Sequence, residues 1–108
     1  MGSEDIKIVR VNEGEFEKEM NCSVPVLADF GADWCGPCKT LWPKLEQKFN
    51  ESQSFKLIAV NIDNNEQTAE KYEVEGLPTV MLFKDGKCVD KFVGMDLAGL
   101  DRLVALTK

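Results

Sequence analysis

Two cysteines separated by two residues are the side chains best suited to chemistry in this sequence. They are Cys35 and Cys38, within the stretch ADFGADWCGPCK, residues 28–39. A cysteine thiolate is a strong nucleophile, and two thiols at this spacing can bridge and exchange with other disulfides. The sequence contains no histidine, which removes the commonest general base and the commonest metal ligand. The pair therefore predicts redox chemistry.

The position of the pair supports that interpretation. A near-continuous apolar run over residues 24–30 predicts a buried strand, and a helical pattern begins at Cys35. The free amides and the dipole at a helix start stabilise an anion, so we expect the Cys35 thiol to ionise more readily than a free thiol. Gly36 allows another backbone to approach the sulfur, and Pro37 stiffens the first turn.

An acidic residue, Asp29, lies inside the apolar run before the cysteines. Burial disfavours a carboxylate, so the pKa of Asp29 should rise toward the range useful for proton transfer. The alternative is a carboxylate that points outward into solvent.

Three other interpretations of the cysteine pair remain open. A structural disulfide would close a very small loop and gain little entropy. A zinc site would need Cys22 and Cys88, yet Cys22 precedes the strand that Cys35 follows, which places them about 23 Å apart. A chance pair of buried thiols is the third, although the run Trp-Cys-Gly-Pro-Cys at a strand–helix junction argues against coincidence.

The elements that must position these residues form one domain over residues 1–108, in the order β-α-β-α-β-α-β-β-α. Alternating or apolar runs predict strands, and amphipathic runs predict helices. The expected strands cover residues 6–11, 24–30, 55–62, 79–83 and 88–93. The expected helices run from a cap at Asn12 to about Met20, from Cys35 onward through Pro43, from a cap at Asp63 to about Tyr72, and over residues 97–106.

Two local signals carry most of that prediction. Leu41, Leu45 and Phe49 recur every four residues, which indicates one helix that is kinked at Pro43 rather than two. Asp85-Gly86, between the last two strands, predicts a tight hairpin. Parallel strands early and a hairpin late give an α/β fold with a mixed sheet and helices on both faces.

Composition excludes several function classes. The chain has 108 residues and a net charge of −6, so we expect neither nucleic-acid nor membrane partners. No basic segment followed by an apolar one marks a secretory signal, and no apolar run is long enough to span a bilayer. Four cysteines are too few for a disulfide scaffold. We expect a cytoplasmic protein, with a processed organellar form left open.

The motifs together resemble the thioredoxin family, over nearly the whole chain. They are ADFGADWCGPCK, Pro43, VNID at residues 60–63, GLPTVMLFKDG at residues 76–86, and Val93-Gly94. The Gly-Pro spacer between the cysteines resembles that of the reducing branch of the superfamily, not the Gly-His spacer of the isomerases or the Pro-Tyr spacer of the glutaredoxins. The resemblance implies the thioredoxin fold, a central mixed five-stranded sheet flanked by four helices.

The resemblance also implies roles for individual residues. Cys35 would attack a substrate disulfide, and Cys38, deeper and more buried, would resolve the mixed disulfide. Asp29 would move a proton to or from Cys38. Pro78 would be a cis-proline facing the sulfurs, with the Leu77 backbone pairing to substrate like an added strand. The remaining substrate-binding positions would be Trp34, Gly36, Pro37, Gly76, Gly94 and Met95.

Two residues depart from the family pattern. Gly31 stands where many relatives have an aromatic residue, which removes packing near the cysteines. Ala59 stands where the bacterial pattern has a lysine close to the buried acid. Without that cation, the pKa of Asp29 should be higher than in lysine-bearing relatives.

Cysteines and tryptophans outside the pair have simpler interpretations. Cys22 and Cys88 fit small apolar filler, with a redox-regulatory or intermolecular thiol as the alternative. Trp34 fits the rim of the redox site better than the core, whereas Trp42 fits packing.

The resulting hypothesis is a monomeric thiol–disulfide oxidoreductase with no bound cofactor or metal. The chain lacks a glycine-rich dinucleotide fingerprint, so electrons from NADPH would reach it through a separate thioredoxin reductase. Its targets would be disulfides in proteins such as peroxiredoxins and reductases. The competing hypothesis is a binding module whose thiols are not used.

Overall fold

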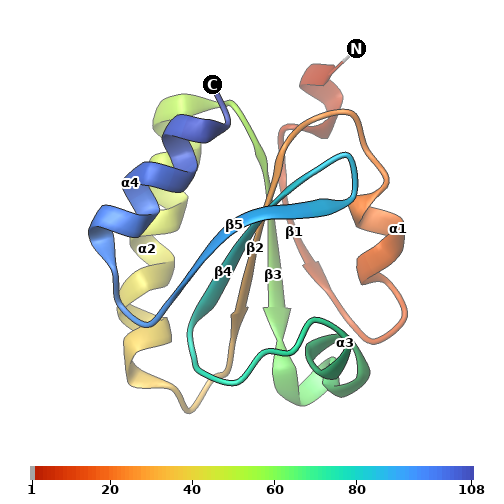
Figure 1. Ribbon diagram of the computed structural model, residues 1–108, viewed down its shortest axis with the longest axis vertical. Coiled ribbons are helices and arrows are strands. Elements are labelled where there is room, and N and C mark those ends of the chain that lie inside the picture. The colour runs from red at the N-terminus through yellow and green to blue at the C-terminus, as the bar shows by residue number, and fades with distance from the viewer. Residues whose placement is uncertain (1) are drawn as a thin grey trace.

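The computed structural model describes residues 2–108, and a five-stranded mixed sheet runs through it in the strand order β1-β3-β2-β4-β5 (Figure 1). The strands are β1 Ile8–Val11, β2 Val26–Gly31, β3 Lys56–Asn61, β4 Thr79–Lys84 and β5 Lys87–Val93. β1, β3 and β2 are parallel, while β4 is antiparallel to β2 and β5 antiparallel to β4. The predicted mixed sheet is confirmed.

Helices cover both faces of the sheet (Figure 1). They are α1 Phe16–Met20, α2 Gly36–Ser52, α3 Glu66–Lys71 and α4 Leu97–Leu106, with short 3-10 helices at Gly2–Asp5 and Ile62–Asn64. One core cluster joins α2 and α4 to the sheet, and a second joins α1 to the opposite face. None of the helices within residues 2–108 is long and apolar enough to cross a membrane.

Strand β2 is central, and every residue in it is buried. Leu27 belongs to the core under α2 and α4, whereas Ala28 and Phe30 belong to the core under α1. Side chains alternate along a strand, so Asp29 projects to the same face as Leu27. A strand covered on both faces explains the near-continuous apolar run, and it carries Asp29 into the interior.

Helix α2 runs unbroken through Pro43. Its buried stripe, Leu41, Leu45 and Phe49, packs on the sheet as the four-residue spacing predicts. The helix begins at Gly36, shortly after β2 ends at Gly31, so its N-terminus lies beyond the carboxyl end of that strand.

The predicted hairpin is also confirmed. Asp85 and Gly86 connect β4 to β5 with φ angles of 54° and 80°. Two consecutive residues with positive φ are the signature of a type I′ turn, for which Asp-Gly is a preferred sequence.

The two predicted helix caps fare differently. The Asn12 N–H donates to Glu15 Oε1 at 2.7 Å, which is half of the expected capping box, but α1 begins only at Phe16. The predicted cap at Asp63 is wrong, because Asp63 lies in a 3-10 helix and α3 begins at Glu66 after Asn65. The carboxylate of Asp63 instead binds Trp34.

Candidate active site

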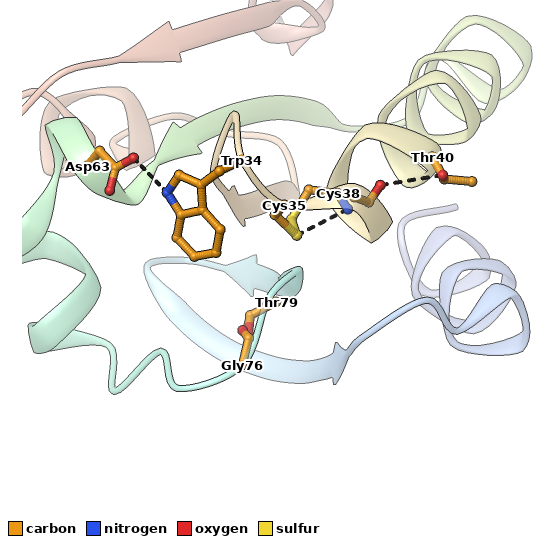
Figure 2. Close-up of a disulfide and its surroundings, with 8 residues drawn as sticks. Trp34, Cys35, Cys38, Thr40, Asp63, Gly76 and Thr79 are labelled. Atoms are coloured by element: carbon orange, nitrogen blue, oxygen red, sulfur yellow. Dashed lines mark hydrogen bonds between the residues drawn. A yellow bond between two sulfur atoms is a disulfide. The ribbon is translucent and has the colours of Figure 1, made fainter.

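Cys35 and Cys38 form a disulfide at the start of α2 (Figure 2). Cys35 is the N-cap of the helix, with extended backbone, and Gly36 and Pro37 make up the first helical residues. The Cα atoms of the pair are 5.3 Å apart, within the ordinary range for a disulfide. The Cys38 N–H donates to Cys35 Sγ at 3.3 Å. The same amide would stabilise a thiolate on Cys35 after reduction.

The two cysteines are equally shielded but face different cavities. Cys35 is 6% exposed and Cys38 is 7% exposed, so the expectation that Cys38 is the more buried is wrong. Cys35 lines a groove of about 460 Å³, here called the front groove, and Cys38 lines a pocket of about 310 Å³, here called the rear pocket. The difference between the cysteines is therefore one of direction.

The front groove gathers several of the predicted substrate-binding residues. It is lined by Trp34, Cys35, Gly36, Pro37, Ile62, Val74, Glu75 and Leu77. Sequence reasoning missed Ile62, Val74 and Glu75. Ile62 follows the end of β3, and the carboxyl ends of parallel strands meet at one edge of a sheet, which is the signal that could have found it.

Trp34 lies at the rim of the front groove. Trp34 is 67% exposed, so the alternative of a core tryptophan is excluded. The indole Nε1–H donates to Asp63 Oδ2 at 3.0 Å, which fixes the ring beside the disulfide (Figure 2). Asp63 is thus a supporting residue of the site that sequence reasoning had assigned to a helix cap.

The Leu77–Pro78 peptide bond is cis, as the family resemblance implied. Leu77 packs against the cluster of Ala32, Cys35 and Cys38. Within residues 2–108, neither the N–H nor the carbonyl of Leu77 bonds to another backbone group. This backbone is therefore free to pair with an incoming chain.

The other predicted groove residues lie beside the groove without lining it. The Gly94 N–H donates to the Pro78 carbonyl at 2.7 Å, which ties Gly94 and the exposed Met95 to the cis-proline. Gly76 accepts a hydrogen bond from the Thr79 hydroxyl (Figure 2). A Cβ at Gly76 would lie 2.8 Å from Val93 Cγ1, so this close approach of two segments favours glycine.

Asp29 is buried, as its place in the apolar strand predicted, and it lines the rear pocket with Cys38, as the family resemblance implied. The residue is 6% exposed, which excludes the solvent-facing alternative, and its Oδ1 atom has no hydrogen-bond partner within residues 2–108. Desolvation raises the pKa of Asp29 to about 7, and the positive charge of Arg10 partly opposes that rise. The comparison with lysine-bearing relatives stays a prediction.

The two departures from the family pattern both line the rear pocket. A Cβ built on Gly31 would lie 3.3 Å from both Cβ and Sγ of Cys38, so a larger residue there would press on that cysteine. Ala59 contributes only a methyl group. Trp42 packs against the core as predicted, and the Arg10 guanidinium carbon lies 5.0 Å from the centre of its ring.

The remaining cysteines lie apart from the pair. Cys22 is half-buried against the core under α1, in agreement with a filler role. Cys88 is exposed on the edge strand β5, so the filler interpretation is wrong for it. In the part of the chain that the structure describes, no three Cys, Asp or Glu side chains gather closely enough to hold a metal ion.

Comparison with known proteins decides the family. The sequence profile described as Thioredoxin matches residues 7–106. The chain belongs to the thioredoxin family. With the family's cysteine pair in place at the start of α2, it is a thiol–disulfide oxidoreductase, and disulfide-containing substrates and a reductase partner follow in general terms.

Relatives within the family include bacterial thioredoxins. The chain is 44% identical over 89 residues to thioredoxin of Pseudomonas aeruginosa, which covers 81% of this chain and 82% of that protein. It is 51% identical over 80 residues to thioredoxin of Chlamydia caviae, covering 73% and 78%. Among solved structures, reduced Schistosoma mansoni thioredoxin pre-protein superposes with a TM-score of 0.86 at 30% identity, covering 94% and 99%. This structural match confirms the thioredoxin fold.

Proposed function

We propose that this chain reduces disulfides of other proteins through a mixed disulfide on Cys35 that Cys38 resolves. The observation that carries the proposal is that the two cysteines line different cavities. Cys35 lines the front groove, which is open to a substrate chain, whereas Cys38 lines the rear pocket with Asp29. Attack from the front and resolution from behind follow from that arrangement.

The first step uses the reduced protein. The Cys35 thiolate, stabilised by the Cys38 N–H and the start of α2, attacks one sulfur of a substrate disulfide. A bond forms between Cys35 Sγ and that sulfur, the substrate disulfide breaks, and the other substrate sulfur leaves as a thiolate that takes a proton from water.

The second step regenerates the disulfide seen in the structure. Asp29, as a carboxylate, takes the proton of the Cys38 thiol, and the Cys38 thiolate attacks Cys35 Sγ. The Cys35–Cys38 bond forms as the bond from Cys35 to substrate breaks. The second substrate sulfur leaves as a thiolate that takes a proton from water, and Asp29 returns its proton to water. The substrate is then fully reduced, and the two electrons it has gained are those lost by the cysteine pair.

The front groove positions the substrate for the first step. The free Leu77 backbone pairs with an extended substrate segment, while the exposed Trp34 and Met95 side chains offer apolar contact area. Gly36 and Pro37 present little bulk next to Cys35, and Gly76, Pro78 and Gly94 hold the Leu77 segment in place.

The partners follow from the chemistry. The oxidised pair takes electrons from NADPH through a separate flavoprotein thioredoxin reductase, and the chain binds no cofactor or metal of its own. Its targets are disulfides such as those of peroxiredoxins and reductases, which it meets as a monomer. Such a reductant works in a compartment that keeps thiols reduced, so we place it in the cytoplasm, with a processed organellar form as the alternative that cell fractionation would reveal.

A turnover assay tests this function. Reduction of a protein disulfide, driven by NADPH and a thioredoxin reductase, is followed for the unmodified chain and for Cys35→Ser, Cys38→Ser and Cys88→Ser. We expect Cys35→Ser to lose essentially all turnover and Cys38→Ser to stop after a single attack, while Cys88→Ser turns over normally because Cys88 lies outside the site. Undiminished turnover by Cys35→Ser would contradict the proposal and favour a binding module.

A further inference from the structure

Three residues on neighbouring strands line up across the sheet beneath the disulfide. Arg10 on β1 pairs with Ala59 on β3, and Ala59 pairs with Asp29 on β2. Residues paired directly across strands project to the same face of a sheet. All three therefore face the layer of α2 and α4, with Arg10 two strands from Asp29, about 10 Å between Cα atoms.

The middle member of this row is too small to separate the outer two. Ala59 ends at a methyl group, and the rear pocket, of about 310 Å³, lies over it. Arg10, Ala59 and Asp29 all line that pocket, together with Cys38. The space left open by Ala59 is thus bordered by the Arg10 side chain, the buried Asp29 carboxyl group and the resolving cysteine.

Trp42 keeps the cation in this position. The indole of Trp42 is packed against the core from α2, and the Arg10 guanidinium lies over its ring with 5.0 Å between the guanidinium carbon and the ring centre. A cation over a tryptophan face is attracted by the ring, which restrains the otherwise exposed Arg10 side chain beside the pocket.

Other charged groups also border the pocket. Asp33, from the segment before the cysteines, and Lys39, from α2, both line it and are both exposed. Lys39 is therefore the competing candidate for a cation that acts on Asp29. Arg10 differs from it because Arg10 lies in the same sheet row as Asp29 and is held against Trp42.

We propose that Arg10 is the positioning residue for proton transfer at this site, because its charge reaches Asp29 across Ala59 and favours the carboxylate that takes the proton of Cys38. The proposal rests on the proposed function for the role of Asp29. It agrees with the direction of the electrostatics, since the Arg10 charge lowers the pKa of Asp29 while burial raises it.

An NMR titration of the Asp29 carboxyl carbon in the reduced protein tests the coupling directly. At low salt, Arg10→Gln should raise the pKa of Asp29 by about half a unit or more, and Arg10→Lys, which keeps the charge, should restore most of the difference. Arg102→Gln is the matched control. Arg102 lies on α4, binds Asp90 on β5 and does not line the rear pocket, so its removal should leave the pKa of Asp29 unchanged. An unchanged titration in Arg10→Gln, or a larger shift in Lys39→Gln, would overturn the proposal.

Ionic strength supplies a second, independent measurement of the same coupling. Added salt screens a charge that acts from an exposed position, so the pKa of Asp29 in the unmodified protein should rise between low and high salt. The same salt change should have a much smaller effect in Arg10→Gln. Equal salt effects in both proteins would contradict the role of Arg10.

Turnover separates this proposal from the function on which it rests. If Asp29 must be ionised, the acid limb of the turnover profile should move to higher pH in Arg10→Gln by the same amount as the titration, with no added effect in an Asp29→Asn background. A titration shift with an unmoved turnover profile would refute the role of Asp29 while leaving the coupling intact. If Asp29→Asn impairs turnover but Arg10→Gln leaves the pKa of Asp29 unchanged, the role of Arg10 is refuted and the role of Asp29 stands.

Discussion

At the scale of single residues, the cost of Asp29 is the clearest physical signature of function. Among the residues that the structure describes, no group bonds to Asp29 Oδ1, so this buried carboxyl group destabilises the fold when it ionises. Nothing in the packing of β2 requires an acid there. An apolar residue would fill this face of a central strand at lower cost. The acid is explained by its place beside Cys38 in the rear pocket.

The cost of Asp29 should appear as a pH dependence of stability. Its pKa is about 7 in the folded chain, against 3.8 for an aspartate in water, so the folded state holds a proton that the unfolded state loses between about pH 4 and 7. Stability should fall as pH rises through that window. Asp29→Asn removes the ionisation, so its stability relative to the parent should improve from pH 4 to pH 8 by up to about 4 kcal/mol.

Urea unfolding of the oxidised proteins at pH 4 and pH 8 measures that change. The unpaired asparagine amide costs the same at both pH values, so the change in the difference between the two proteins isolates the Asp29 ionisation. A stability difference between Asp29→Asn and its parent that is independent of pH would show that Asp29 titrates normally.

Sequence reasoning reached the residues of the site unevenly. Cys35, Cys38 and Asp29 were predictable because each is marked by its local surroundings. Arg10 was not, since it precedes Asp29 by 19 positions and meets it only through the pairing of β1 with β3 and of β3 with β2. Asp63 was misassigned to a cap because its true partner, Trp34, lies 29 residues earlier.

At the scale of elements, local signals were reliable where the interaction is local. The Asp85-Gly86 turn and the stripe on α2 depend on neighbours within a few residues, and both match the structure. The predicted cap at Asp63 was wrong because the Asp63 carboxylate accepts a hydrogen bond from Trp34, a residue distant in sequence. A local interaction also marks the start of α4, where the Asp96 side chain caps the helix.

Removal of that cap should destabilise the molecule. The Asp96 Oδ1 atom accepts a hydrogen bond from the Gly99 N–H at 2.8 Å, so Asp96→Ala should lower the free energy of unfolding by about 1 kcal/mol. Asp96→Asn keeps an accepting oxygen and should lose much less. Equal losses in the two variants, measured by urea unfolding, would mean that the cap hydrogen bond contributes nothing to stability.

At the scale of the whole molecule, the sheet places the two sulfurs between two cavities. The chain order of strands and helices, and the mixed sheet, were predictable from hydrophobic patterns. The neighbours of each strand were not: β1 pairs with β3 rather than with β2, and this pairing brings Arg10 into the rear pocket. The location of Cys35 in front and Cys38 behind depends on that assembled architecture.

Trapping the covalent complex with a substrate tests this account most directly. In Cys38→Ser the resolving thiol is missing, so the reduced variant mixed with a disulfide-containing protein should accumulate a mixed disulfide on Cys35, located by mass spectrometry of the linked peptides. Cys35→Ser should form no such complex. A substrate adduct on Cys22 or Cys88 in place of Cys35, or the absence of any adduct on Cys38→Ser, would contradict the assignment of Cys35 as the attacking residue.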